Sequence, residues 1–196
     1  MTNSRVRPAS KAQWRQRTGD AGQAFIEFAF IMLMLSILVF GLIDFGRLIY
    51  EHEVLVNLSR EGSNLASRGT GLTNTLQAIE TDSALNLSDS NGLIIVSTVD
   101  FNTNSPGSFF VNQQLSQGLL PQTSKIGTGS GSNVTAHVPT VLLGPPPVPS
   151  TNRTLYCTEV YHKFIPITPV GKLLVLTLPT EEYDAAYFLG YSDNSP

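Results

Sequence analysis

The sequence predicts an α+β fold in which a long N-terminal transmembrane and projecting helix packs on a small antiparallel sheet. Three observations predict it. Residues 28–43 form an apolar run of 16 residues without a charge. Leucines and valines then recur at helical spacing to about residue 65. The rest of the chain holds short β-branched and aromatic segments between Gly, Pro, Asn and Ser, which is typical of strands joined by turns.

The first 22 residues form a basic leader. They carry five of the 12 Lys and Arg residues and one of the 15 Asp and Glu residues, so the chain beyond Gly22 has a formal charge of −7. Basic residues before a membrane span favour a cytoplasmic N-terminus, with the following domain on the outer side. An acidic domain repels phosphate backbones, so we expect no nucleic-acid partner.

A membrane span is predicted to follow this leader. Residues 24–43 cover about 30 Å at 1.5 Å per residue, which is the thickness of one hydrocarbon core. Glu27 then lies near the cytoplasmic face and Asp44 near the outer one. Arg47 follows Asp44 by three positions, so the two side chains are expected to pair at the membrane interface. Tyr50 lies where interfacial aromatic residues are common.

A secretory signal peptide is the rival interpretation, because it also combines a basic start with an apolar run. Val39 and Gly41 would form a poor cleavage pair, and that interpretation gives Glu27 no purpose. A charge within a membrane segment costs roughly 2.5–3.5 kcal/mol at mid-helix, so such a residue tends to mark a function. A signal peptide is therefore disfavoured, and an uncleaved anchor is another alternative.

Residues 22–28, GQAFIEF, place a glycine five residues before a glutamate at the start of the apolar helix. This order resembles the type IV prepilin signal, in which a membrane peptidase cuts after the glycine. Together with GLIDFGRLIY (41–50) and, more weakly, SREGSNLA (59–66), it resembles the TadE-like minor pilins of tight-adherence (Flp-type, type IVc) pili. The resemblance covers residues 19 to about 66. That family often carries a proline in the apolar helix, and this chain has none there.

The resemblance implies cleavage between Gly22 and Gln23, with Glu27 and Phe28 serving recognition and assembly. The new amino group at Gln23 would meet the Glu27 carboxylate of an adjacent subunit within an apolar bundle, so that each buried charge relieves the other. A carboxylate that reaches the cytoplasmic headgroups is the alternative role of Glu27. The implied fold is pilin-like, and neither an enzyme activity nor a cofactor is implied.

The implied partners are the prepilin peptidase, the major Flp-type pilin, a companion minor pilin, the inner-membrane assembly platform and membrane lipid. We expect a single-pass protein of the bacterial inner membrane, with a cytoplasmic N-terminus and a periplasmic C-terminal domain. Incorporation into the extracellular pilus, and adhesion at its tip, are left open. The alternative function is a membrane-tethered extracytoplasmic binding module with a passive anchor.

The chain is expected to divide into a leader and three further parts. The leader comprises residues 1–22, the transmembrane helix 23–47, and a projecting helix with a short second helix 48–88. Residues 89–196 form the exported β-rich domain, with loop or disorder at about 102–152, where Asn, Ser, Gly, Pro and Gln dominate.

Individual elements follow from local patterns. The long helix is expected from Ala24 to the glycines of residues 69–71, and a second helix over 72–84 with Asn74 or Thr75 as its cap. Strands are predicted over residues 92–101, 153–168 and 173–178, with a last strand or packing tail over 183–191.

No catalytic or metal-binding constellation is recognisable in the sequence. His52, His137 and His162 have no metal-ligand spacing, and Glu51, His52 and Glu53 point in different directions on a helix, which predicts a solvated face. Cys157 is the one cysteine of the chain, so no intrachain disulfide can form. Burial in a strand is the preferred interpretation of this thiol, and pairing with another chain is the alternative.

Overall fold

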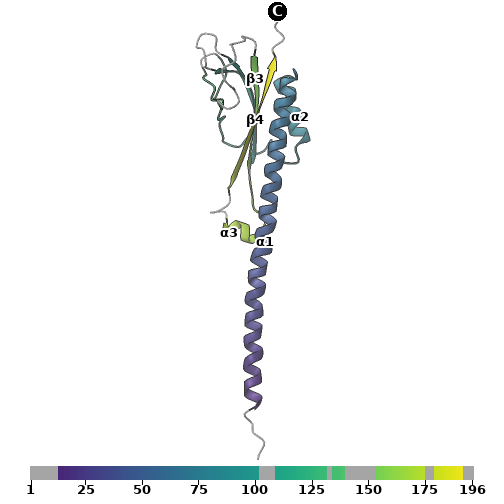
Figure 1. Cartoon of the computed structure of the whole chain (residues 1–196), viewed down its shortest axis with the longest axis vertical. Helices are drawn as coiled ribbons and strands as arrows, with labels where there is room; N and C mark the ends of the chain where they lie inside the picture. The colour runs from purple at the N-terminus through teal and green to yellow at the C-terminus, as the bar shows by residue number, and fades with distance from the viewer. Residues whose placement is uncertain (1–12, 102–108, 132–133, 140–152, 175–178, 192–196) are drawn as a thin grey trace, which may run out of the picture.

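A single long helix runs through the molecule, and a small sheet packs along its C-terminal half (Figure 1). Helix α1 spans Gln13–Ser67, which is 55 residues and roughly 80 Å at 1.5 Å per residue. The predicted α+β fold is confirmed. The computed structural model describes residues 13–101, 109–131, 134–139, 153–174 and 179–191.

The helix α1 begins at Gln13, earlier than the predicted start at Ala24, so it continues through Gly22 without a break. Its predicted end at the glycines is confirmed. Gly69 has a φ of +88°, its amide donates to the Ala66 carbonyl at 3.2 Å, and the Thr70 amide donates to the Leu65 carbonyl at 3.3 Å. This is a Schellman motif, which satisfies the last carbonyls of a helix and favours glycine at the left-handed position.

Four antiparallel strands form one sheet in the order β2-β1-β3-β4. Strand β1 (Gly92–Phe101) forms a consecutive pair with β2 (Phe109–Gly118), and β3 (Arg153–Lys163) lies between β1 and β4 (Glu181–Tyr191). The predicted strands over 92–101 and 183–191 are thus confirmed, and the strand predicted from residue 153 ends at Lys163, before Pro166.

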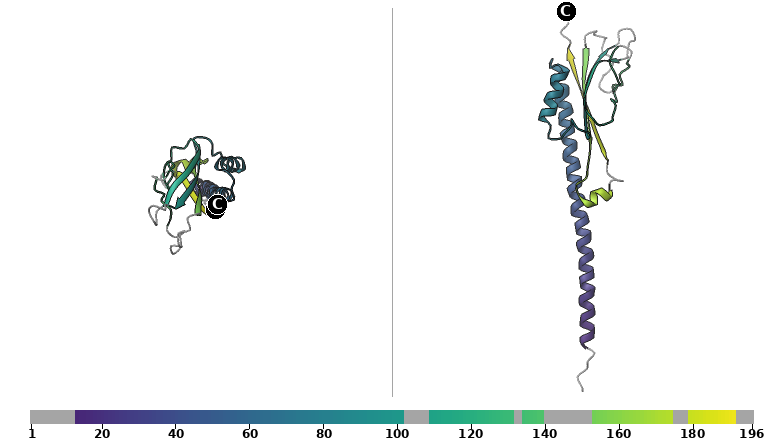
Figure 2. Two further views of the ribbon diagram at one scale, coloured as in Figure 1. Left: turned by 90° about the horizontal axis from the view of Figure 1, so that it is seen from above. Right: turned by 180° about the vertical axis from the view of Figure 1, so that it is seen from behind.

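Side chains of the sheet alternate between two faces. Even-numbered residues such as Ile94, Val96 and Val160 face α1 and α2 (Leu72–Asp82), which lie along one face of the sheet (Figure 2). Odd-numbered residues such as Val99 and Cys157 face the segment that follows β2. Cys157 is fully buried there, and burial raises the pKa of its thiol, so the predicted strand burial is confirmed.

Small residues bring α1 close to the sheet. Ser59, Ser63 and Ala66 have no exposed surface, and the Ser63 hydroxyl donates to the Ala186 carbonyl at 2.7 Å. A Cβ at Gly62 would lie 2.8 Å from the Thr158 side chain and would collide with that of Ile79. The SREGSNLA segment therefore packs closely on the sheet.

A buried carboxylate joins the opposite face of the sheet to the segment after β2. Glu159 has no exposed surface and accepts hydrogen bonds from the hydroxyl of Ser124, the amide of Lys125 (2.9 Å) and the hydroxyls of Tyr161 (3.2 Å) and Tyr183 (3.1 Å). Burial and the nearby Glu159 carboxylate raise the pKa of both tyrosines well above the usual range. Both phenols therefore stay protonated and can donate.

Three local predictions are wrong, each for a physical reason. The loop expected over 102–152 contains strand β2, an edge strand in which Val111 is the one buried residue, so the run of Asn112, Gln113 and Gln114 shows no alternating pattern. A strand is expected over 173–178, but residues 173 and 174 are the last two residues of helix α3 (Pro169–Leu174). Residues 175–178 lie outside the described residues. Gly71, with no side-chain cap, precedes α2 in place of the expected Asn74 or Thr75.

Candidate functional site

The N-terminal half of α1 is uncovered and apolar. All 15 large apolar side chains from Phe25 to Ile43 are at least 39% exposed. Within the described part of the chain, this helix is the one that is long and apolar enough to cross a membrane. The head, which we define as α2, the sheet and α3, first meets α1 near its middle (Figure 1). The uncovered half thus lacks any protein partner from the described remainder of the chain.

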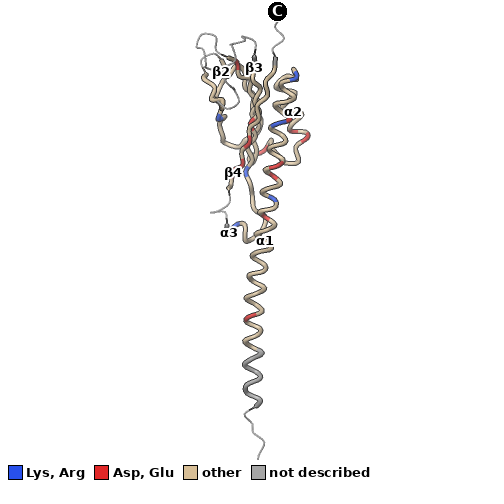
Figure 3. The backbone as a smooth tube through the Cα atoms, in the orientation of Figure 1, with Lys and Arg blue, Asp and Glu red and all other residues tan. Residues whose placement is uncertain are grey.

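One carboxylate interrupts this apolar surface. Glu27 is exposed, and the side-chain amide of Gln23, one turn earlier, donates to its Oε1 at 3.0 Å. Figure 3 shows this single acidic band on the described membrane-side part of α1. Gln23 and Glu27 lie on the same side of the helix because they are four residues apart. Phe28 follows, half exposed.

At the junction with the head, Asp44 is buried rather than placed among lipid headgroups. It is 1% exposed, and its Oδ1 accepts from the amides of Ile167 (3.1 Å) and Thr168 (3.4 Å), while its Oδ2 accepts from the Thr168 hydroxyl. The Gly171 amide donates in turn to that hydroxyl at 3.0 Å. A Cβ at Gly171 would collide with the Asp44 carboxylate, so this close approach requires glycine. Asp44 therefore fastens the β3–β4 connection, including α3, to α1.

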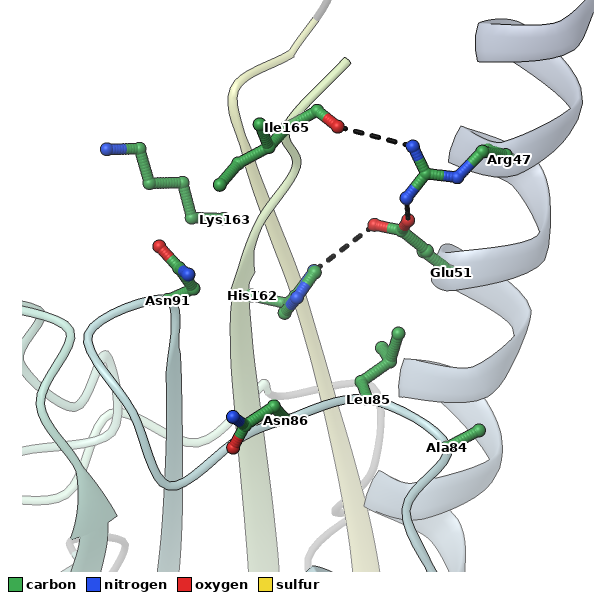
Figure 4. Close-up of a pocket in the computed structure, with 9 residues that line it drawn as sticks. All are labelled: Arg47, Glu51, Ala84, Leu85, Asn86, Asn91, His162, Lys163 and Ile165. Atoms are coloured by element: carbon green, nitrogen blue, oxygen red, sulfur yellow. Dashed lines mark hydrogen bonds and ion pairs between the residues drawn. The ribbon is translucent and has the colours of Figure 1, made fainter. Parts of the chain in front are cut away.

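The prediction that Asp44 pairs with Arg47 is wrong. Arg47 donates from Nη2 to Glu51 Oε1 at 2.7 Å and from Nη1 to the Ile165 carbonyl at 3.3 Å (Figure 4). Asp44 takes its hydrogen bonds from the β3–β4 connection, which sequence spacing alone does not reveal. Tyr50 is 56% exposed, as an interfacial aromatic residue requires.

Glu51 faces the head and meets two residues from distant parts of the sequence. Its Oε2 lies 3.4 Å from His162 Nδ1, and Glu182 lies close enough that one ligand atom from each of the three side chains is within 4.8 Å of the others. The prediction of a solvated face is therefore wrong for Glu51, which is 4% exposed, although His52 and Glu53 are exposed. Sequence reasoning missed this cluster because no local spacing connects its members.

The electrostatics of this cluster follow from burial. Burial lowers the pKa of His162, and the Glu51 and Asp89 carboxylates oppose that shift. Burial, followed by the charge of Glu51, raises the pKa of Glu182 to about 7. The recess beside Glu51 and His162 measures about 220 Å³ (Figure 4), below the ~300–1,000 Å³ of typical small-molecule sites. It therefore gives little support to a binding module for a sizeable ligand.

Comparison with known proteins finds a family similarity in the N-terminal region. Residues 22–64 match the family model described as TadE-like protein. No curated protein and no solved structure matches the chain. The TadE-like segment begins at Gly22, includes the whole uncovered surface, and ends within the part of α1 that packs on the sheet. It indicates a part in a tight-adherence pilus, and the long apolar helix fits a membrane-anchored pilin.

Within the TadE-like segment, the structure places the predicted processing and assembly residues on one continuous helix. Gly22 lies inside α1, and a Cβ built there would meet no atom within 4 Å. Gln23, Glu27 and Phe28 follow within two turns. Cleavage after Gly22 stays a prediction, as do the assembly roles of Glu27 and Phe28.

Replacing Asp44 by alanine is expected to release the β3–β4 connection from α1. The amides of Ile167 and Thr168 would lose their acceptor, and an unsatisfied buried donor costs about 1–3 kcal/mol. A loss of about 2 kcal/mol corresponds to a roughly thirtyfold larger population of the locally open state. Hydrogen exchange of these two amides in the detergent-solubilised protein measures the effect.

The exposed Glu53→Ala on the same helix is the matched control for Asp44→Ala, and it should leave both amides protected. Equal exchange rates in the wild-type chain and Asp44→Ala would show that this carboxylate does not hold the connection.

Proposed function

We propose that this protein is a minor pilin or pseudopilin of a tight-adherence pilus, processed after Gly22 and held in the bacterial inner membrane by the N-terminal half of α1. The observation that carries the proposal is the uncovered apolar surface from Phe25 to Ile43 with Glu27 as its one charge. The TadE-like match over the same residues supports it.

An uncovered helix of this kind has two suitable environments. Lipid covers the apolar surface while the subunit stays in the membrane, because a spanning helix satisfies its own backbone hydrogen bonds. Other apolar helices cover it when the subunit enters a filament. The second environment excludes water and lipid headgroups from Glu27, so the carboxylate then needs a cationic partner. The amino group of Gln23 from an adjacent processed subunit has the required charge.

The orientation follows from the charges on each side of the span. The basic leader remains cytoplasmic, and the head lies in the periplasm. Ile165 and Ile167, in the connection that Asp44 fastens, are about half exposed at the side of the head from which the bare helix emerges. They fit contact with the outer membrane interface of the span. The prepilin peptidase, assembly platform, major pilin and a companion minor pilin are the proposed partners.

Mass measurement of the mature chain from its native host tests the proposal. We expect the first residue to be Gln23 in the wild-type protein and Met1 in Gly22→Val. Glycine offers the smallest bulk at the scissile bond and the least resistance to local unwinding of the helix. A Cβ at this position has nothing within 4 Å, so valine fits there and the fold is preserved.

Gly41→Val is the matched control, because its Cβ would also meet nothing within 4 Å on the same helix. It should be processed like the wild type. A mature chain that begins at Met1 or at Leu42 would contradict the proposal, as would complete processing of Gly22→Val or processing in cells without the prepilin peptidase.

A further inference from the structure

Three side chains of ligand type meet at the membrane-side end of the head. Glu51 comes from α1, His162 from the end of β3 and Glu182 from the start of β4. His162 and Glu182 are direct partners in the register of the two strands. Both have even numbers, so the alternation of the sheet directs them toward α1, where Glu51 lies. The cluster therefore follows from the fold and joins three elements.

The three side chains have unmet bonding capacity. Glu51 Oε2, His162 Nδ1 and Glu182 Oε2 are buried and have no hydrogen-bond partner among the described residues. Glu51 is 4% and Glu182 6% exposed. Buried polar groups are normally satisfied, and the cost of leaving one unpaired increases with its charge. The three side chains lie together without a hydrogen bond at these atoms, and one bound cation would satisfy all of them.

We propose that Glu51, His162 and Glu182 bind one divalent transition-metal ion of the zinc class. One imidazole and two carboxylates are a donor set that zinc accepts, with a water in the fourth position. Ligand atoms about 2.1 Å from a tetrahedral ion lie roughly 3.4 Å apart, and the Nδ1 to Oε2 distance between His162 and Glu51 is 3.4 Å. The remaining separations, up to 4.8 Å, close with small side-chain rotations.

Arg47 supports this arrangement. It binds Oε1 of Glu51 at 2.7 Å, which orients the carboxylate and leaves Oε2 directed toward His162 (Figure 4). Such outer contacts commonly fix metal ligands. The charges of Arg47 and Asp89 act on the pKa of His162 in opposite directions. The bound ion would tie α1 to β3 and β4 close to the Asp44 junction. The metal site does not depend on the proposed function.

Metal binding to the untagged full-length protein in detergent tests the proposal. The protein is stripped with a chelator, incubated with ZnCl2, desalted and analysed for zinc by mass spectrometry. We expect about one zinc per chain, and a rise in the melting temperature with zinc concentration because an ion that binds only the folded state stabilises it. His162→Gln and Glu182→Gln should each lose the bound zinc and the shift.

His137→Gln and Glu53→Gln are the matched controls, because they make the same changes at exposed residues. Both should bind zinc like the wild type. Zinc content that stays equal in His162→Gln or Glu182→Gln, or a wild-type chain that retains no zinc, would overturn the proposal.

A second measurement uses only the wild-type chain and so does not depend on the folding of the variants. Diethyl pyrocarbonate modifies histidine side chains, and peptide mass spectrometry reports each of them. Zinc should slow the modification of His162 at least tenfold and leave that of His52 and His137 unchanged. Equal modification of His162 with and without zinc would refute the site.

Discussion

A chain carrying Glu27→Gln is expected to reach the inner membrane in wild-type amounts and to be missing from assembled pili. Glutamine keeps the size of the side chain and can still interact with Gln23, but it removes the charge. A neutral amide is easier to place in a membrane than a carboxylate, so insertion should not suffer. Within a filament, however, the new amino group of the adjacent subunit would be buried without its counter-charge.

The expected effect on assembly is large. Breaking a buried ion pair by removing one partner costs about 3–5 kcal/mol, and 3 kcal/mol already corresponds to more than about a hundredfold loss of incorporation. Quantitative immunoblots of sheared pili and of membranes from the same cells separate incorporation from insertion. Glu27→Asp, which keeps the charge on a shorter side chain, should retain more incorporation than Glu27→Gln.

Glu53→Gln makes the same chemical change at an exposed position of α1 outside the span. It should assemble normally and so controls for the loss of one charge. If Glu27→Gln entered pili as efficiently as this control, Glu27 would have no part in assembly. The anchor would then be passive, which favours the alternative of a membrane-tethered binding module.

Replacing Glu159 by alanine is expected to cause the largest loss of stability in the head. Donors from Ser124, Lys125 and Tyr183 end on this fully buried carboxylate, and the Tyr161 hydroxyl is shared between it and the Thr123 carbonyl at 3.0 Å. Each unsatisfied buried donor costs about 1–3 kcal/mol, although water that enters the vacated space recovers part of it. A net loss of about 3–5 kcal/mol is a large part of the stability of a domain this size.

Urea unfolding followed by the near-UV circular dichroism of the tyrosines measures the effect, because Tyr161 and Tyr183 belong to the network. Glu159→Gln should cost much less than Glu159→Ala, since its carbonyl can still accept and its amide can donate to Ser124. Glu181→Ala removes an exposed carboxylate of the neighbouring strand with one hydrogen bond, at 2.9 Å to Gln122, and is the control. Similar midpoints for Glu159→Ala and Glu181→Ala would show that the network contributes little.

The sequence predicts those parts of the structure that depend on local pattern. The apolar run and its helical continuation identify α1, and β-branched residues identify β1, because both signals come from neighbours along the chain. Strand β2 escapes prediction because an edge strand has few buried side chains and therefore little alternation. For α3, the Thr168-Pro169 pair is a helix-start signal, since Pro is favoured at the first helical position.

The site is predictable to a smaller extent. Glu27 stands out because a charge in an apolar run is unusual, and its neighbours on the helix face follow from spacing. Asp44 also stands out, but its partners lie more than 120 residues away. The meeting of His162 with Glu182 requires the register of β3 and β4, and that of both with Glu51 requires the packing of α1 on the sheet. No spacing rule contains this information.

Because α1 is one continuous helix, it fixes the direction of the head about the helix axis as well as its distance from Glu27. Each residue of an α-helix advances the azimuth by about 100°, and no proline lies between Glu27 and Asp44, which fastens the β3–β4 connection to α1. The number of residues between these two acids therefore decides which side of the shaft the head occupies relative to the carboxylate. Glu27, which would contact a neighbouring subunit, would therefore also determine the direction in which the head faces outside the membrane.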